Sequence, residues 1–151
     1  MALDRGLIGR EYPGETLLIS RSRLRFFAKA TGQTDPVYTD LDAAQRAGHR
    51  DLPVPPSFFT AIALEHPDPF AWMAELGIDL RTVLHGSQEF TYHRMAYAGD
   101  ELTSTPTITD IYDKRGGALQ FIVRTARFTN QDAELVADAV ETIIVRELTL
   151  S

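Results

Sequence analysis

Apolar residues at helical spacing follow one short strand at the start of the chain. Residues 15–20 (ETLLIS) are mostly apolar or β-branched, which predicts a strand. A helix is predicted over residues 21–31, because Ser20 can cap its first turn and Gly32 can close its C-terminus. The apolar stripe of this helix is predicted to consist of Phe26, Phe27 and Ala30.

Three further helical segments are predicted before the period changes. Asp40 is a suitable N-cap for a helix over residues 41–47. Residues 52–64 run from a proline-rich approach into an almost wholly apolar segment, which predicts a buried central helix with Ser57 as its N-cap. Residues 70–76 predict a short amphipathic helix. Its large side chains, expected in the core or lining a tunnel, are Trp72 and Met73.

After residue 82 the apolar residues alternate with polar ones, which is typical of strands. Four strands are predicted, over residues 83–93, 101–114, 118–129 and 135–147. They are separated by Gly- and Asn-containing turns at residues 98–100, 115–117 and 130–132. One early strand, buried helices and then an antiparallel meander predict an α+β fold, with the sheet wrapped around the central apolar helix.

The composition of the chain limits the number of domains, the kinds of partner and the chemistry that can be expected. A chain of 151 residues that is 44% hydrophobic has enough material for one core, so we expect residues 1–151 to form a single domain. The sequence has no cysteine, which excludes disulfides, thiolate nucleophiles and cysteine-ligated metals. A formal net charge of -6 argues against a nucleic-acid partner. We expect no metal and no cofactor, because neither metal-ligand spacing nor a glycine-rich phosphate loop is present.

The first residues have neither a basic segment nor an apolar stretch like those of a signal peptide. No apolar run approaches the length that spans a bilayer. We therefore expect a cytoplasmic protein without a membrane partner.

The stretch over residues 26–40 places polar side chains directly after a helix end. It resembles the motif F-A-x-x-T-G-D-x-N-P-x-H-x-D of R-specific enoyl-CoA hydratases and MaoC-like dehydratases. Six residues match that motif: Phe27, Ala28, Thr31, Gly32, Pro36 and Asp40. The catalytic Asp of the family falls on Gln33, its Asn falls on Asp35 and its catalytic His falls on Tyr38.

The second half extends the resemblance over nearly the whole chain. Residues 84–94 (LHGSQEFTYHR), residues 98–100 (AGD) and residues 129–132 (TNQD) are similar to segments of MaoC amino-terminal, or FAS1-like, dehydratase domains. The same combination resembles the non-catalytic subunits of heterodimeric hydroxyacyl dehydratases. The resemblance implies a hotdog fold and an acyl-CoA or acyl-carrier-protein thioester as ligand. It also implies a second chain, as a homodimer or with a catalytic MaoC-like subunit.

The resemblance assigns seven candidate site residues. The degenerate catalytic positions are Gln33, Asp35 and Tyr38, and the substrate-binding positions are Ser57, Phe58, His85 and Gly86. The amide side chain of glutamine cannot act as a general acid or base, and an unperturbed tyrosine has a pKa of about 10. Asp35 is either a substitute base or a turn cap. Ser57 is either a helix cap or a source of a backbone N–H for the thioester carbonyl, since Pro56 has none.

Several functions remain compatible with these residues. The chain is interpreted as the acyl-binding half of a hydratase or dehydratase whose partner carries the catalytic residues. A self-sufficient homodimer would use Asp35 as its base. A hotdog thioesterase would depend on Glu65, near the end of the central helix. A non-enzymatic acyl-CoA-binding module would bind the ligand without turnover.

Overall fold

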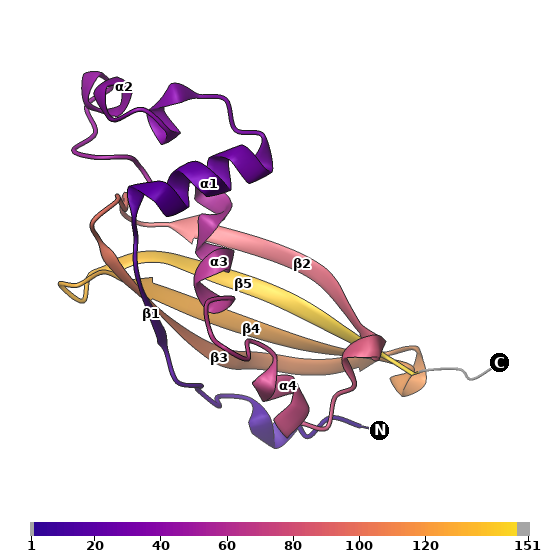
Figure 1. The fold of residues 1–151 in the computed structure, drawn as a ribbon. Helices are drawn as coiled ribbons and strands as arrows, with labels where there is room; N and C mark the ends of the chain where they lie inside the picture. The colour runs from indigo at the N-terminus through magenta and orange to yellow at the C-terminus, as the bar shows by residue number, and fades with distance from the viewer. Residues whose placement is uncertain (1, 148–151) are drawn as a thin grey trace.

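A curled antiparallel sheet of five strands forms the body of the protein in the computed structural model, which describes residues 2–147. The strands are β1 (Glu15–Leu18), β2 (Val83–Tyr92), β3 (Glu101–Lys114), β4 (Leu119–Thr129) and β5 (Leu135–Arg146). The α-helices are α1 (Arg21–Thr31), α2 (Leu41–Arg46), α3 (Phe59–Ala63) and α4 (Ala71–Glu75). Short 3-10 turns are η1 (Arg5–Leu7), η2 (Pro36–Tyr38), η3 (Pro56–Phe58), η4 (Leu80–Thr82) and η5 (Arg115–Gly117). Figure 1 shows α3 and α4 against one face of the sheet, with α1 above α3 on the side of β2 and α2 farther out.

This arrangement confirms the predicted α+β hotdog fold, although one detail of the predicted meander was wrong. The strand order is β1-β3-β4-β5-β2. Only β3, β4 and β5 follow one another as neighbours, whereas β2 pairs with β5 at the far edge of the sheet. Local sequence specifies hairpins through their turns, but the pairing of β2 with β5 depends on contacts distant along the chain.

Helix α1 begins and ends where its capping residues predict. The Ser20 side chain accepts from the Arg23 N–H, and Gly32 ends the helix in the left-handed conformation, with φ of 70°. The predicted apolar stripe was partly wrong. The helix buries Leu24 and Ala28, while Phe26 is 73% exposed.

The central helix is short and begins without a side-chain cap. It consists of η3 followed directly by α3, and its buried residues are Phe58, Phe59 and Ile62. The prediction of Ser57 as N-cap was wrong, because Ser57 lies inside η3, where Pro55 is the N-cap and no side chain caps the turn. The segment is also not buried all round, since Leu64 at its end is 59% exposed.

The core forms two clusters on the face of the sheet that the helices cover. One cluster lies under α1 and α3 and includes Phe58, Phe128 and Ala137. The other includes Trp72 and Met73 of α4. Its remaining buried members are Tyr12, Ile78, Ile108, Ile111, Ile122 and Ile143.

Two of the predicted turns are joined through a buried carboxylate. The Asp100 carboxylate accepts from Arg50 at 2.6 Å, from the Gln131 side chain at 3.2 Å and from the Tyr97 N–H at 2.9 Å. Burial alone raises the pKa of Asp100, but these hydrogen bonds outweigh burial and hold the pKa below 3.8. Asp100 therefore joins the AGD and TNQD segments and holds the two turns together.

We expect the substitution Asp100→Ala to lower the free energy of unfolding by about 2–3 kcal/mol, because it removes three hydrogen bonds to a buried charge. The pKa is lower in the folded state, so this contribution is complete above pH 3.8 and is lost as pH falls through the folded-state pKa. Chemical denaturation at neutral and acidic pH measures it. Asp132→Ala in the neighbouring exposed turn is the control and should shift stability by less than about 0.5 kcal/mol.

Candidate functional site

The polar side chains of the 33–38 loop serve as local caps. The Gln33 Oε1 accepts from the Asp35 N–H at 3.0 Å, and the Asp35 Oδ1 accepts from the Val37 N–H at 3.0 Å. Asp35 is thus the N-cap of η2. Arg25 of α1 donates its Nε–H to the Thr39 carbonyl at 2.8 Å, which holds the loop against the helix.

The structure brings Gln33 and Asp35 together, and both are exposed. Tyr38 is half-buried in η2. The hollows over the sheet and beside α1 are lined by other residues. The catalytic assignment of these three positions therefore stays a prediction, while the capping geometry of Asp35 is directly visible.

A tyrosine on β2 fixes the start of the central helix. The Tyr92 hydroxyl donates to the Pro56 carbonyl at 2.8 Å, and its ring stacks on Phe90. Burial raises the pKa of Tyr92, so its phenol stays protonated and remains a donor at neutral pH. Ser57 beside this contact is exposed, whereas Phe58 is buried edge-on against Phe27.

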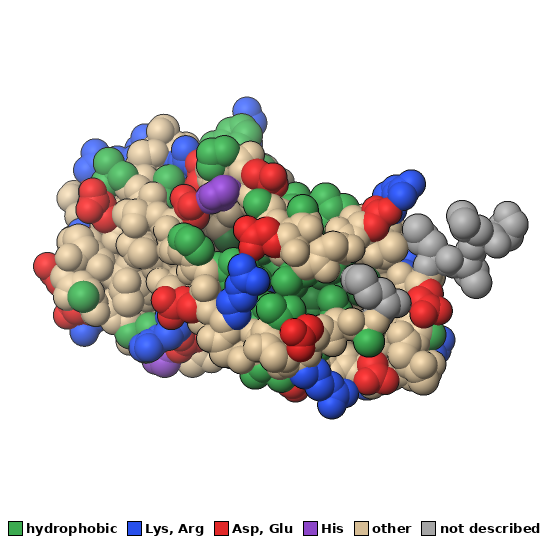
Figure 2. Space-filling model, turned by 90° about the horizontal axis from the view of Figure 1, so that it is seen from below, with side chains coloured by type: hydrophobic (Ala, Val, Ile, Leu, Met, Phe, Trp, Pro, Cys, Tyr) green, Lys and Arg blue, Asp and Glu red, His purple; other side chains and the backbone are tan. Residues whose placement is uncertain are grey.

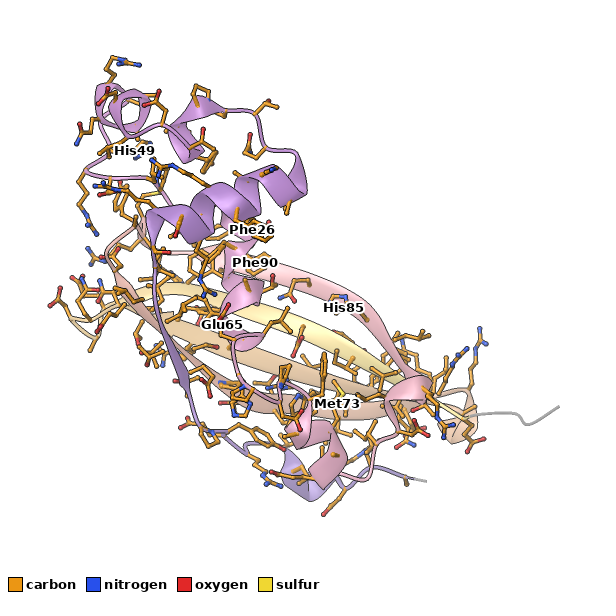
Figure 3. All side chains as sticks on the ribbon, viewed as in Figure 1. Phe26, His49, Glu65, Met73, His85 and Phe90 are labelled. Atoms are coloured by element: carbon orange, nitrogen blue, oxygen red, sulfur yellow. The ribbon has the colours of Figure 1, made fainter. Side chains whose placement is uncertain are left out.

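A hollow of about 320 Å³ lies between the helices and the sheet, and we call it the main hollow. Its walls are mostly apolar and include Phe59, Leu64, Phe70, Trp72, Met73, Phe128 and Ile143. Its polar lining residues include His85, Gln88, Arg124 and Glu141. In Figure 3, Met73 on α4 and His85 on β2 mark its two sides. An apolar cavity with a few converging polar groups is the usual form of a small-molecule site.

Two predicted binding residues lie on β2 beside this hollow. His85 lines it, and the strand has a bulge between His85 and Ser87. A Cβ on Gly86 would lie 3.0 Å from both the Thr142 carbonyl oxygen and the Ile144 Cδ1. Gly86 therefore lets β2 approach β5 closely at the bulge.

An ion pair interrupts the apolar face of the sheet inside the main hollow. Arg124 and Glu141 are cross-strand partners on β4 and β5, with Arg124 Nη1 3.0 Å from Glu141 Oε1. The Arg124 side chain is 12% exposed, and its Cζ lies 4.0 Å from the centre of the Trp72 ring. Burial lowers the pKa of Arg124, and the Glu141 charge partly counteracts this.

Sequence reasoning missed this pair, although strand periodicity carried the signal. On β4, Arg124 occupies the same face as Ile122 and Ala126, and on β5, Glu141 alternates in step with Ala139 and Ile143. A charge at an inward position of an apolar alternation is unusual. It indicates either a functional group or a paired core charge.

Two further side chains that could act as acid–base groups have protein partners. Glu65, on which a thioesterase would depend, pairs with Arg23 at the surface. His93 Nε2 lies 2.7 Å from the Asp138 carboxylate. Within residues 2–147, no group of three or more His, Asp or Glu side chains is arranged to hold a metal ion. None of the helices formed by these residues is long and apolar enough to cross a membrane.

Comparison with known sequences finds relatives over most of the chain. Residues 6–139 match the model of the FAS1-like dehydratase domain region. A UPF0336 protein of Saccharopolyspora erythraea is 35% identical over 147 residues, covering 97% of this chain and 93% of that protein. A UPF0336 protein of Streptomyces coelicolor is 41% identical over 125 residues, covering 77% of this chain and 83% of that protein.

Solved structures with the same fold include dehydratases. One chain of the HadBC (3R-hydroxyacyl-ACP dehydratase) complex of Mycobacterium tuberculosis is 25% identical, with a TM-score of 0.77, covering 95% of this chain and 99% of that one. A MaoC-like dehydratase is 25% identical with a TM-score of 0.80, covering 93% of this chain and 42% of that one. The ChsH1–ChsH2 complex of Mycobacterium tuberculosis shares the fold, with a TM-score of 0.76 at 21% identity, covering 93% of this chain and 86% of that one.

The ion pair in the main hollow makes a prediction about stability. We expect Arg124→Leu to lower the free energy of unfolding by about 2–4 kcal/mol, because the partly buried Glu141 charge loses its partner. The double substitution Arg124→Leu/Glu141→Leu should recover most of that loss, since no unpaired charge remains. Denaturant unfolding of the three proteins measures both effects, and a double variant less stable than the single one would contradict the prediction.

Proposed function

The chain belongs to the FAS1-like dehydratase domain family, and from this premise we propose that it is the acyl-binding unit of a MaoC-like enoyl-CoA hydratase or 3-hydroxyacyl-thioester dehydratase. In this proposal residues 1–151 act as one hotdog domain beside a partner chain that supplies the catalytic Asp and His. The observation that carries it is the main hollow, combined with a motif loop whose acid–base positions are Gln33 and Tyr38.

The chemistry supports this division of roles. Hydration of an enoyl thioester needs a base for water, an acid for the α-carbon and donors for the enolate oxygen. Gln33 does not titrate, and the Asp35 carboxylate already accepts the Val37 N–H. Loss of an acid–base group costs about 10²–10⁴ in rate, so the chain alone is expected to be a poor catalyst.

The main hollow supports an acyl ligand. Its volume of about 320 Å³ and its mostly apolar walls suit the aliphatic part of an acyl thioester. His85, which lines the hollow, and the backbone N–H of Ser57 in η3 are the groups proposed to contact the thioester end. Gly86 and the buried Phe58 are proposed to shape the space around them.

A partner chain is supported by the exposed edge of the sheet. β2 ends the strand order, so one of its backbone edges is available for another strand. Large side chains on β2 and just after its end are exposed, namely Leu84, Tyr92 and Met95. The structures named HadBC and ChsH1–ChsH2 are complexes that each contain a chain with this fold. The partner is proposed to be a MaoC-like chain that carries the intact D-x-N-P-x-H motif.

The test measures hydration of an enoyl-CoA by the purified chain, by a candidate partner and by the two together. We expect the mixture to exceed the sum of the separate rates by about 10²-fold or more. The control is a partner whose motif Asp and His are replaced, which should abolish the gain. Strong activity of the chain alone would establish a self-sufficient enzyme instead, and release of free CoA dependent on Glu65 would establish a thioesterase.

Asp35→Ala separates capping from catalysis. Because Asp35 caps η2, the substitution should lower the free energy of unfolding by about 0.5–2 kcal/mol. It should leave the hydration rate of the two-chain mixture within about twofold of the rate with the unmodified chain. A twofold change in rate corresponds to about 0.4 kcal/mol in activation free energy. Thr34→Ala on the same exposed loop is the control. A rate loss of about 10²-fold without a stability change would identify Asp35 as a catalytic base.

A further inference from the structure

A second hollow adjoins the main hollow. It has a volume of about 240 Å³, and its own lining residues include Tyr12, Glu15 and His66. Residues that line both hollows are Ala63, Pro69, Trp72, Ser104, Pro106 and Arg124. Figure 2 shows hydrophobic side chains in a recess bordered by charged ones on the lower side of the molecule. The shared residues form a partition between two neighbouring spaces.

Arg124 and Trp72 are the bulkiest parts of this partition, and they lie face to face. The Arg124 Cζ is 4.0 Å from the centre of the Trp72 ring and 5.8 Å from that of the Tyr12 ring. The Tyr12 ring in turn meets Trp72 edge-on, with their centres 6.2 Å apart. Contact of a guanidinium with the faces of aromatic rings helps to hold it in place. Glu141 fixes its other side through the ion pair at 3.0 Å.

Polar groups at this position work against stability. The Arg124 Nε and the Tyr12 hydroxyl are both buried, and neither has a hydrogen-bond partner within residues 2–147. A buried donor without an acceptor, like a partly buried ion pair, is less favourable than apolar packing. Ile122 and Ala126, the same-face neighbours of Arg124 on β4, show that the strand accommodates apolar residues there.

We propose that Arg124, stacked on Trp72 and paired with Glu141, sets the length limit for the acyl chain in the main hollow. This inference rests on the proposed acyl-binding function. An acyl chain that reached the second hollow would have to separate the guanidinium of Arg124 from Trp72. It would also have to place its methylene groups against a charge. The second hollow has about three quarters of the volume of the first, so opening the partition adds substantial apolar space.

The test measures binding of straight-chain acyl-CoAs of increasing length to the full chain by titration calorimetry. Each methylene buried in an apolar site should strengthen binding about fourfold. For the unmodified protein, we expect this gain to stop at a definite acyl-chain length. The variant Arg124→Leu/Glu141→Leu replaces the ion pair without leaving an unpaired charge, and its gain in affinity should continue to longer acyl chains.

The matched control is Arg127→Gln/Asp138→Asn. Arg127 and Asp138 are also cross-strand partners on β4 and β5, with side chains on the opposite face of the sheet, so their loss should leave the length limit unchanged. The same limit in all three proteins, or no limit in the unmodified chain, would overturn the inference while leaving the acyl-binding function intact. Absence of binding at every length would overturn both.

Discussion

A five-stranded curled sheet has to be covered by a helix of only eight residues, and this mismatch governs the rest of the structure. η3 and α3 together extend from Pro56 to Ala63, which covers the sheet mainly beside the first core cluster. The chain therefore adds α4, whose Trp72 and Met73 complete a second cluster farther along the strands. The space left between the two clusters is the main hollow. A longer central helix would fill this space with its own side chains.

The ion pair of Arg124 and Glu141 lies at the boundary between those clusters. On β4, Phe128 belongs to the first cluster and Ile122 to the second, with Arg124 between them on the same face. A charge at this point keeps the clusters from merging, because apolar side chains that closed over it would have to desolvate it. The pair thus stands as a polar barrier between the two clusters.

Local features of the fold could be predicted from the sequence, whereas long-range features could not. Ser20 and Gly32 specify the ends of α1 because caps act within one turn, and the glycine and asparagine turns specify the β3–β4 and β4–β5 hairpins. The place of β2 beside β5 depends on packing across the whole sheet. The site divides in the same way. His85 could be named from a motif, but the closeness of Arg124 to Trp72 depends on how α4 crosses β4.

The motif residues that resemble those of dehydratases indicate the fold more directly than they indicate a catalytic activity. Asp35 caps η2, and Asp100 joins two turns through Gln131, so both motif residues have structural roles that need no substrate. A loop whose polar groups are satisfied by the backbone keeps its shape whether or not it carries an acid or a base. Residues that would determine substrate selectivity can therefore lie outside this loop. The ion pair in the main hollow lies outside every matched motif segment, and it is the charged group that faces the space an acyl chain would enter.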